Sequence, residues 1–215
     1  ENVKLVDSPL GQIPEGWEAT TVGDLAIHER RSVKPQEVDP GTPYIGLEHI
    51  PRKSITLNEW GFAADIESTK HRFYEGEILF GKIRPYFHKV IVAPFDGICS
   101  SDAIVIAARE EKFFPAILSC VSSVPFVDHA TQTSQGTKMP RANWDVLTKY
   151  SLPLPPDELL SDFNEVVNNI VASLKTLMLK NRNLRNTRDL LLPKLISGKL
   201  DVEDLDIDTG LPAEV

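Results

Sequence analysis

One uninterrupted helical stretch constrains this sequence more than any other feature. From Asp157 to Leu192 there is no proline or glycine, and apolar residues recur in alternating steps of four and three. This spacing is a heptad seam, in which the positions called a and d face a partner helix. At a rise of 1.5 Å per residue, these 36 residues predict a rod of about 54 Å.

Eight of the ten seam positions are apolar, and all ten are predicted to pair with another helix. Asn181 occupies an a position, where a buried asparagine commonly fixes the register of two helices; an asparagine at a solvated point of the seam would look the same. The a positions are Val167, Leu174, Asn181, Arg188 and Leu195, and the d positions are Phe163, Ile170, Leu177, Leu184 and Leu191.

The predicted rod is longer than a domain of about 150 residues is wide, so part of its seam must contact something else. A second helix is the natural candidate, and the alternative is one amphipathic helix that lies on its own domain. Pro193 is expected to kink or end the helix, and Gly198 to stop it.

A change of composition near residues 153–157, at PLPPD, divides the chain. We predict a globular domain over residues 1–155, the long helix over 156–200 and an acidic tail over 201–215. Short helices are expected after a cap in TTVGDL and over Phe113–Val121, where Pro115 suits the first turn. Strands are expected at Thr42–Leu47, Ile78–Phe80, Lys89–Ala93, Ala103–Ala107 and Ser151–Leu154. The predicted fold class is α+β: a β-rich globular domain followed by a long coiled-coil-forming α-helix.

The formal net charge of −8 argues against a generic nucleic-acid binder, but the charge is unevenly distributed. Residues 201–215 carry −6, which leaves −2 for the other 200 residues. The segment from Lys70 to Lys89 contains five lysines and arginines but only two glutamates. A local basic surface on an acidic protein is therefore compatible with the composition.

Enzyme signatures are missing from the sequence, which contains no GxGxxG, GxxxxGK[ST], HExxH or GxSxG motif. The five histidines lack metal-ligand spacing, and the Ser100-Ser101-Asp102 run is ordinary turn chemistry. We therefore expect no catalytic residue, no metal and no cofactor bound by this chain.

The two cysteines, Cys99 and Cys120, do not make a disulfide framework, and the apolar run around Cys120 predicts a small buried side chain. The reducing cytoplasm is the simplest compartment. No stretch approaches the roughly 18 apolar residues of a membrane span, so no membrane is expected among the partners.

Two polar segments have the composition of surfaces that read DNA. Residues 76–90 are GEILFGKIRPYFHKV, and residues 133–144 are TSQGTKMPRANW. Arginine forms paired hydrogen bonds with guanine, glutamine and asparagine suit adenine, and lysine neutralises phosphate. The alternative is structural: Arg84 would pair with an internal carboxylate, and the second segment would only cover the core. The candidate DNA-binding residues are Arg72, Lys82, Arg84, Tyr86, His88, Lys89, Gln135, Lys138, Arg141 and Asn143.

The chain resembles the specificity (S) subunit of type I DNA restriction–modification systems. The stretches that carry the resemblance are LGQIPEGWE at 10–18, GEILFGKIRPYFHKV at 76–90, SSDAIVI at 100–106, SQGTKMPRANWDVL at 134–147, YSLPLPPDE at 150–158 and LRNTRDLLLPKLISGKL at 184–200. They span nearly the whole chain in the expected order. One departure is Leu159, where the family usually shows glutamine after the glutamate of its PPxxEQ-like junction.

The resemblance implies a target-recognition domain that reads one half of a split sequence in double-stranded DNA, followed by a helix that packs antiparallel to a second one. It implies a non-catalytic subunit that recruits modification (methyltransferase) subunits, which carry S-adenosylmethionine, and restriction (translocase and endonuclease) subunits. The family's usual chain has two domain-plus-helix repeats and this sequence has one. It therefore resembles a half-size subunit, expected to homodimerise through its helix, or the second half of a full one.

A different class of function stays open from the sequence. The chain could be a non-enzymatic, dimeric coiled-coil adaptor whose β-rich domain binds protein. Lysine and arginine gathered on one face would favour DNA, and a large exposed apolar face would favour protein. An independent nuclease or methyltransferase is disfavoured by the missing motifs.

Overall fold

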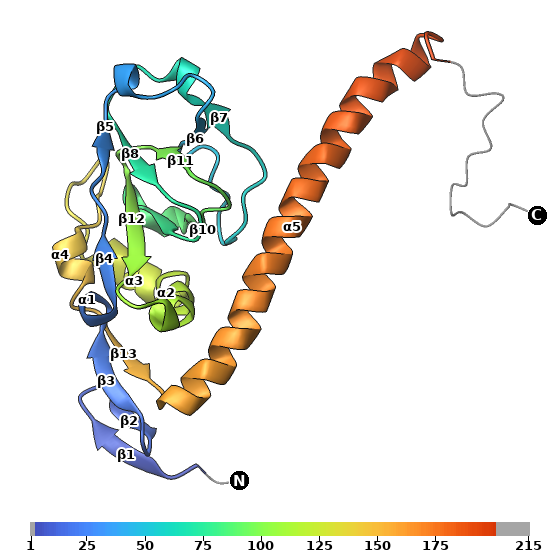
Figure 1. Ribbon diagram of the computed structural model, residues 1–215. Coiled ribbons are helices and arrows are strands. Elements are labelled where there is room, and N and C mark those ends of the chain that lie inside the picture. Colours follow the sequence, from blue (N-terminus) through green and yellow to red (C-terminus); the bar gives the residue numbers. More distant parts are fainter. Residues whose placement is uncertain (1–2, 201–215) are drawn as a thin grey trace, which may run out of the picture. The chain divides into compact units, whose positions relative to one another are not determined.

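Two β-sheets form the centre of the domain in the computed structural model, which describes residues 3–200 (Figure 1). The first is antiparallel, in the order β10 (Val90–Val92), β9 (Ile78–Gly81), β12 (Ala103–Ala108) and β4 (Ala26–His28). The second has the order β5 (Ser32–Val33), β8 (Lys70–Phe73), β11 (Gly97–Cys99), β6 (Pro43–Ile45) and β7 (Gly61–Phe62), with β11 and β6 parallel.

The central strands β9 and β12 are buried on both faces. In β12, Ile104 and Ile106 belong to one apolar cluster, whereas Ala103 and Val105 belong to another. Side chains of a strand alternate between its faces, so two separate cores require apolar residues at successive positions. This explains why AIVIA and ILF are unbroken apolar runs rather than alternating patterns.

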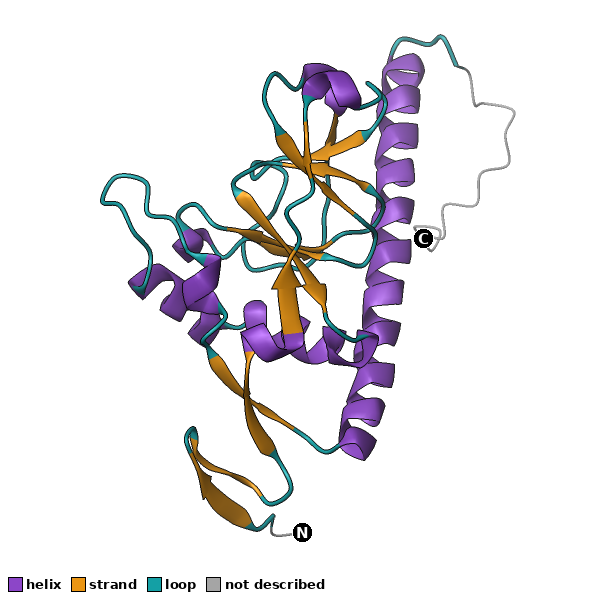
Figure 2. Cartoon of the chain, turned by 60° about the vertical axis from the view of Figure 1, so that its left-hand side comes forward, coloured by secondary structure: helices purple, strands orange, loops and turns teal. Residues whose placement is uncertain are grey.

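Short helices cover the first of these cores (Figure 2). They are α1 (Val22–Leu25), α2 (Phe114–Val121), α3 (Val124–Gln132) and α4 (Trp144–Leu147). As predicted, α1 begins at Thr21, whose hydroxyl accepts from the Asp24 amide while the Asp24 carboxylate accepts from the Thr21 amide. Pro115 lies in the first turn of α2, also as predicted. Single 3₁₀ turns occur at Pro35–Glu37, Ala63–Asp65, Pro85–Phe87 and Glu111–Phe113.

Two further strand pairs lie together at one end of the domain (Figure 1). β1 (Leu5–Ser8) and β2 (Gly11–Pro14) form a hairpin. β3 (Glu18–Thr21) pairs antiparallel with β13 (Ser151–Leu154), so that Leu154 lies opposite Glu18. The second pair ties the start of the domain to the segment that leads into the long helix.

The long helix, α5, runs from Asp157 to Ile196. Its 40 residues correspond to about 60 Å. Pro193 lies inside the helix, so of the two expected effects, a kink or an end, the end at Pro193 is wrong. The predicted stop at Gly198 is confirmed: Gly198 has a φ of +67°, its amide donates to Leu195, and the Lys199 amide donates to Lys194.

The chain divides into two compact units, one ending at Met178 and the other beginning at Leu179. The first half of α5 therefore belongs to the globular unit. Leu160 and Met178 are buried, and Val167 and Val171 pack against the first apolar cluster. The predicted acidic tail, 201–215, lies outside the described residues.

The predicted pairing seam is split by this packing. Val167 and Leu174 are half-buried, with Val167 against its own domain, so Val167 is not free to face a partner helix. The physical reason is that the domain covers a and e positions in the first half of the helix, at Leu160, Val167, Val171 and Met178, and leaves the d positions exposed. An exposed strip remains, made of Leu159, Phe163, Val166, Ile170, Leu177, Leu184, Leu191 and Leu195.

The predicted fold class is confirmed, and five predicted strands exist with small changes of boundary. The expected strand over Thr42–Leu47 is only Pro43–Ile45, because the chain turns at Gly46, whose amide donates to His49 Nδ1. No single helix in residues 3–200 is long and apolar enough to cross a membrane; one bent pair, Glu111–Val121 with Val124–Gln132 at 69°, passes only when both are taken together.

Candidate functional site

The two polar segments singled out in the sequence meet in the folded domain. The Ala142 amide donates to the Lys82 carbonyl (2.9 Å), and the Arg84 amide donates to the Pro140 carbonyl (2.7 Å). Ile83 and Arg141 form a bridge between these two bonds. The segment after β9 is therefore paired with the segment before α4, and their side chains share one surface.

The second segment closes on itself as a small polar loop. Gln135 and Arg141 exchange both backbone hydrogen bonds (3.0 and 2.8 Å), and the chain turns between them. Gly136 has a φ of +96°, a conformation that side chains with a Cβ rarely adopt. Asn143 then caps α4, its Oδ1 accepting from the Asp145 amide (2.9 Å).

A cleft of about 470 Å³ opens beside this junction. Its polar lining comes from four segments that are far apart in the sequence, and its apolar part comes from Ile104, Ala142 and Trp144. Among the predicted residues, the cleft gathers Lys82, Gln135, Arg141 and Asn143. It adds His28, Arg30 and His71, which the sequence did not indicate.

The cleft is positively charged. Lys82 Nζ donates to the Ser101 carbonyl (2.6 Å), which fixes the ammonium group at the rim. Arg141 Nε lies 3.7 Å from Asp102 Oδ1, and its side chain remains half exposed. With Arg30 also in the lining, three cations face the cleft, which suits a phosphate or the acceptor edge of a base.

His28 and His71 are neutral at physiological pH. Burial, with the positive charges of Arg30 and Lys82 added, lowers the pKa of His28 to about 4. Burial and the same two cations also lower the pKa of His71. The two rings are edge-on at 6.4 Å between centroids, and Trp144 lies edge-on to His28 at 6.0 Å.

Hydrogen bonding fixes the tautomer of His28. Arg30 Nε can only donate, and it donates to His28 Nδ1 (3.3 Å). The neutral ring therefore carries its proton on Nε2, and this buried atom has no hydrogen-bond partner among the described residues. His71 Nδ1 is in the same situation. The cleft thus holds one unpaired donor and one further unpaired ring nitrogen.

The 3₁₀ turn Pro85–Phe87 beside the cleft is held in a strained form. Arg84 and His88, which flank it, have φ values of +49° and +52°, which cost about 1–2 kcal/mol each in residues other than glycine. The Arg84–Pro140 bond and a bond from His88 Nε2 to the Ser122 carbonyl (2.8 Å) hold the turn. Strain of this kind persists where surrounding contacts over-determine the backbone, and it clusters at functional sites.

Not every candidate DNA-binding residue lies in the cleft. His88 is buried and bonded to Ser122, and Lys89 Nζ donates to the Leu47 carbonyl, where burial lowers its pKa. Tyr86 is exposed on the 3₁₀ turn, and Lys138 is exposed at the loop tip. Arg72 is half-buried on β8, next to His71 in the chain but outside the cleft lining.

The structural alternative for Arg84, a pairing with an internal carboxylate, is not observed among the described residues. Its guanidinium Nε is buried and has no hydrogen-bond partner among the described residues, whereas the alternative required an internal carboxylate. In residues 3–200 no group of three histidine, cysteine or carboxylate side chains could hold a metal ion.

His28, Arg30 and His71 were missed because only long-range pairing brings them to the cleft. β4 pairs with β12 so that His28 lies opposite Ile106, and β8 pairs with β11 so that His71 lies opposite Cys99. Neither segment has a local motif. The one available signal was the run His28–Arg31, in which three basic side chains and Glu29 follow directly on the apolar start of β4.

No family model matches the sequence. The chain is 30% identical over 165 residues to the type I restriction enzyme EcoDI specificity subunit of Escherichia coli, over 75% of this chain and 35% of that protein. It is 26% identical over 211 residues to the type I restriction enzyme MjaIX specificity subunit of Methanocaldococcus jannaschii, over 90% of this chain and 46% of that protein.

Solved structures share the fold. The HsdS subunit from Thermoanaerobacter tengcongensis matches with a TM-score of 0.57 and 20% identity, over 95% of this chain and 55% of that one. A chain from a structural study of complex assembly and conformational transition of the type I R-M system matches with a TM-score of 0.54 and 23% identity, over 92% of this chain and 53% of that one. The chain thus spans between about a third and a half of the length of its curated relatives.

Proposed function

We propose that this chain belongs to the family of type I restriction-enzyme specificity subunits and is a DNA-recognition subunit that reads one half of a bipartite target. The observation that carries the proposal is the cleft, in which two segments with the side chains of base readers are joined by backbone hydrogen bonds. The relatives found by comparison are specificity subunits, which does not favour the alternative of a protein-binding adaptor.

The cleft supplies both kinds of contact that a duplex requires. Lys82 and Arg30 suit phosphates, and Gln135, Asn143 and Arg141 offer the donor and acceptor groups that distinguish base edges. Asn143 retains its amide nitrogen for a base edge, since its cap uses only Oδ1. The chain itself contributes recognition and no catalytic step.

The partners follow from the acidic balance of the chain as well as from its family. With a net charge of −8, the chain alone has little electrostatic affinity for DNA, so partner subunits supply much of it. These partners are modification subunits, which carry S-adenosylmethionine and methylate the DNA, and restriction subunits, which translocate and cleave it. The complex acts in the cytoplasm.

The chain is further proposed to homodimerise through α5, with the two helices antiparallel. The exposed strip supports this: Phe163, Ile170 and Leu177 remain in solvent although the domain has already covered the neighbouring side of the helix. Burying a strip of this kind against a second copy removes apolar surface from water on both helices. Two identical domains would then read an inverted-repeat target with an unspecified spacer.

Gel-shift titration with and without a co-expressed modification subunit tests the proposal. The isolated chain should bind DNA weakly. The complex should bind an oligonucleotide that contains the site it methylates much more tightly than a scrambled oligonucleotide. Lys82→Ala should weaken binding by the complex, whereas the control Lys34→Ala, at an exposed position outside the cleft, should not. Binding that is tight without the modification subunit, or that is insensitive to Lys82, would contradict the proposal.

A further inference from the structure

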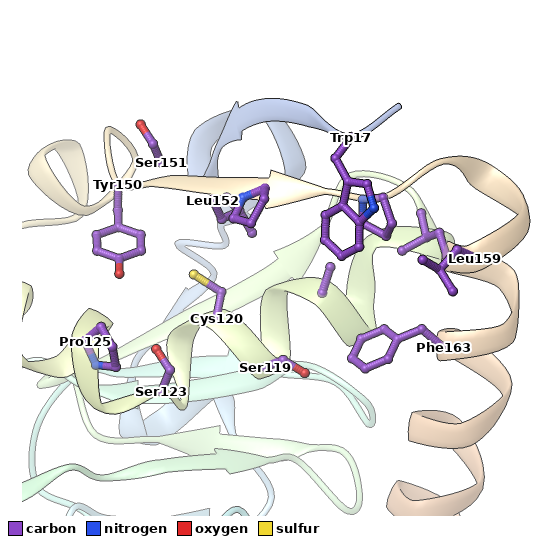
Figure 3. Close-up of a pocket in the computed structure, with 14 residues that line it drawn as sticks. Trp17, Ser119, Cys120, Ser123, Pro125, Tyr150, Ser151, Leu152, Leu159 and Phe163 are labelled. Carbon is purple, nitrogen blue, oxygen red and sulfur yellow. The ribbon is translucent and has the colours of Figure 1, made fainter. Parts of the chain in front are cut away.

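The cleft and a groove at the start of α5 have similar volumes, about 470 Å³ each, but different chemistry. Figure 3 shows Trp17 and Phe163 at one end of the groove and Cys120 farther along it. Cys120 is half-buried because it lines this groove, so the expectation of a fully buried side chain is wrong. None of the described residues that line the groove is a lysine, arginine, asparagine or glutamine. The side chains suited to base edges are therefore those of the cleft.

Arg141 and Asn143 project from the same side of an extended segment. Arg141 lies in a β-bridge, and Asn143 has φ −108° and ψ 124°. Side chains of an extended chain alternate, and the residue between them, Ala142, is only 6% exposed whereas both neighbours are exposed. Two residues of extended chain advance about 6.6 Å, close to the rise of two base pairs, about 6.8 Å. The spacing suits contacts with bases one or two steps apart.

The helix cap decides what Asn143 can offer to a base. Its Oδ1 accepts from the Asp145 amide (2.9 Å), which directs the oxygen toward α4 and fixes the plane of the side-chain amide. An asparagine that reads adenine turns its oxygen to N6 and its nitrogen to N7 at the same time. The adenine contact that this residue type suggests therefore needs the oxygen that the cap already uses. Nδ2 remains, and it is a donor only.

Asp102 orients Arg141 from one side. Arg141 Nε lies 3.7 Å from Asp102 Oδ1. The backbone of Asp102 is fixed, because its carbonyl accepts from the Lys82 amide (2.9 Å) and its amide donates to Ser100 Oγ (3.2 Å). A carboxylate beside Nε leaves the two terminal nitrogens of the guanidinium group to face outward, and these are the donors that pair with guanine O6 and N7.

The rest of the lining is also rich in donors. Arg30 and Lys82 can only donate, and none of the described lining residues is an aspartate or glutamate. Besides the capped Asn143, Gln135 and His71 are the lining side chains with a group that can accept. In the major groove guanine presents two acceptors, whereas adenine and cytosine each present an amino donor. A site made mainly of donors is complementary to guanine.

We propose that the half-site read by this chain contains a guanine that Arg141 contacts through O6 and N7, with Asp102 as its positioning residue and Asn143 Nδ2 donating to an acceptor of a nearby base. The inference rests on the proposed DNA-recognition function and names the base that the site reads. A phosphate also attracts donors, but the charge of Asp102 offsets that of Arg141. This weakens the attraction for an anion and leaves hydrogen bonds to a neutral guanine edge.

Base analogues test the contact in the complex of the full chain with its modification subunit, after the target has been mapped from the sites it methylates. Each guanine of the half-site is replaced in turn by 7-deazaguanine, which lacks N7. The matched control is hypoxanthine, which lacks only the amino group in the minor groove. At one guanine, 7-deazaguanine should weaken binding about tenfold and hypoxanthine should not. In the Arg141→Ala complex the same replacement should have little further effect.

Protein variants test the two supporting residues. Asp102→Asn should reduce the preference for guanine over adenine at that position about fivefold or more. Its binding to scrambled DNA should stay equal or rise, because a negative charge near the phosphates is removed. Asp128→Asn, at an exposed position on α3 outside the cleft, should change neither. Asn143→Asp keeps a good helix cap but loses the donor, so it should weaken binding at one other base position.

The outcomes separate the inference from the function on which it rests. A target half-site without guanine, or one that tolerates 7-deazaguanine at every guanine, would overturn the guanine contact and leave sequence-specific recognition intact. Equal weakening of specific and scrambled DNA by Asp102→Asn, with a lower melting temperature, would overturn the positioning role. A complex that binds target and scrambled DNA equally would overturn the proposed function itself.

Discussion

The amide of Ala142 donates a hydrogen bond of 2.9 Å to the carbonyl of Lys82, and this bond joins the two polar segments 76–90 and 133–144, which the sequence keeps far apart. It fixes Arg141 and Asn143, on either side of Ala142, relative to the end of β9. Side chains that share a rigid backbone junction can read neighbouring groups on one ligand, whereas side chains on separate flexible loops cannot do so with a fixed spacing.

Arg141→Ala should distinguish base reading from phosphate contact in the assembled complex. If Arg141 forms paired bonds with guanine, the loss should be about 1–3 kcal/mol and confined to one base position of the target. If it contacts phosphate, binding should weaken for all sequences and the salt dependence should fall. Affinity measurements on single-base variants at two salt concentrations separate these outcomes. A drop in melting temperature with unchanged DNA affinity would assign Arg141 to the ion pair with Asp102 instead.

The stability of the domain should fall as the pH drops from about 6.5 to about 4. Since the pKa of His28 is lowered to about 4 in the folded state, the unfolded chain binds a proton in this range before the folded chain does, and this favours unfolding. Urea unfolding at pH 7.5 and pH 5 should show a smaller loss in His28→Gln than in the parent protein. Equal losses in both proteins would mean that His28 does not contribute.

Met178 and Leu177 are adjacent in α5, but their substitution should affect different properties: the stability of the monomer for Met178 and self-association for Leu177. Met178 is buried in the second apolar cluster, so Met178→Ala should lower the free energy of unfolding by about 2 kcal/mol or more. Leu177 is 55% exposed, so Leu177→Ala should leave the unfolding free energy of the monomer nearly unchanged and weaken self-association. Chemical denaturation at low protein concentration and sedimentation at high concentration measure the two effects. Destabilisation of the monomer by Leu177→Ala would show that the exposed strip already contacts its own domain.

The length of α5 should set the spacing of the DNA target. Inserting seven residues at the centre of the helix preserves the heptad phase and adds about 10.5 Å, close to three base pairs of B-DNA at about 3.4 Å each. Mapping methylated sites made by the complex before and after insertion should show an inverted repeat whose spacer grows by about three base pairs. A symmetric target with an unchanged spacer would exclude the helix as a ruler, and an asymmetric target would exclude the homodimer.

The elements predicted correctly from the sequence are those that depend on neighbouring residues in the chain. The apolar runs of β9 and β12, the Thr21 cap and the uninterrupted α5 are each visible within a few residues. Elements that form only through pairing with distant strands were not predicted from the sequence. β8, with the sequence KHRF, has no apolar pattern and becomes a strand only because β11 and β5 pair with it.

The same contrast holds for the candidate site. Lys82, Gln135, Arg141 and Asn143 were indicated by residue type in polar segments with turn signals, and the fold brings them together. His88 has the same residue chemistry, but its imidazole is used inside the domain. Which polar side chains are consumed internally depends on packing that is not encoded within the segment that carries them.

The burial of β9 and β12 on both faces has a consequence for how recognition can diversify. The frame is determined by side chains inside two cores, whereas Gln135, Arg141 and Asn143 are exposed beside it. In the proposed role, substitutions at the exposed positions would change which bases are accepted without altering either core. Mutations can therefore change the target sequence at exposed positions, while the residues of the two cores, which are different positions, keep the fold.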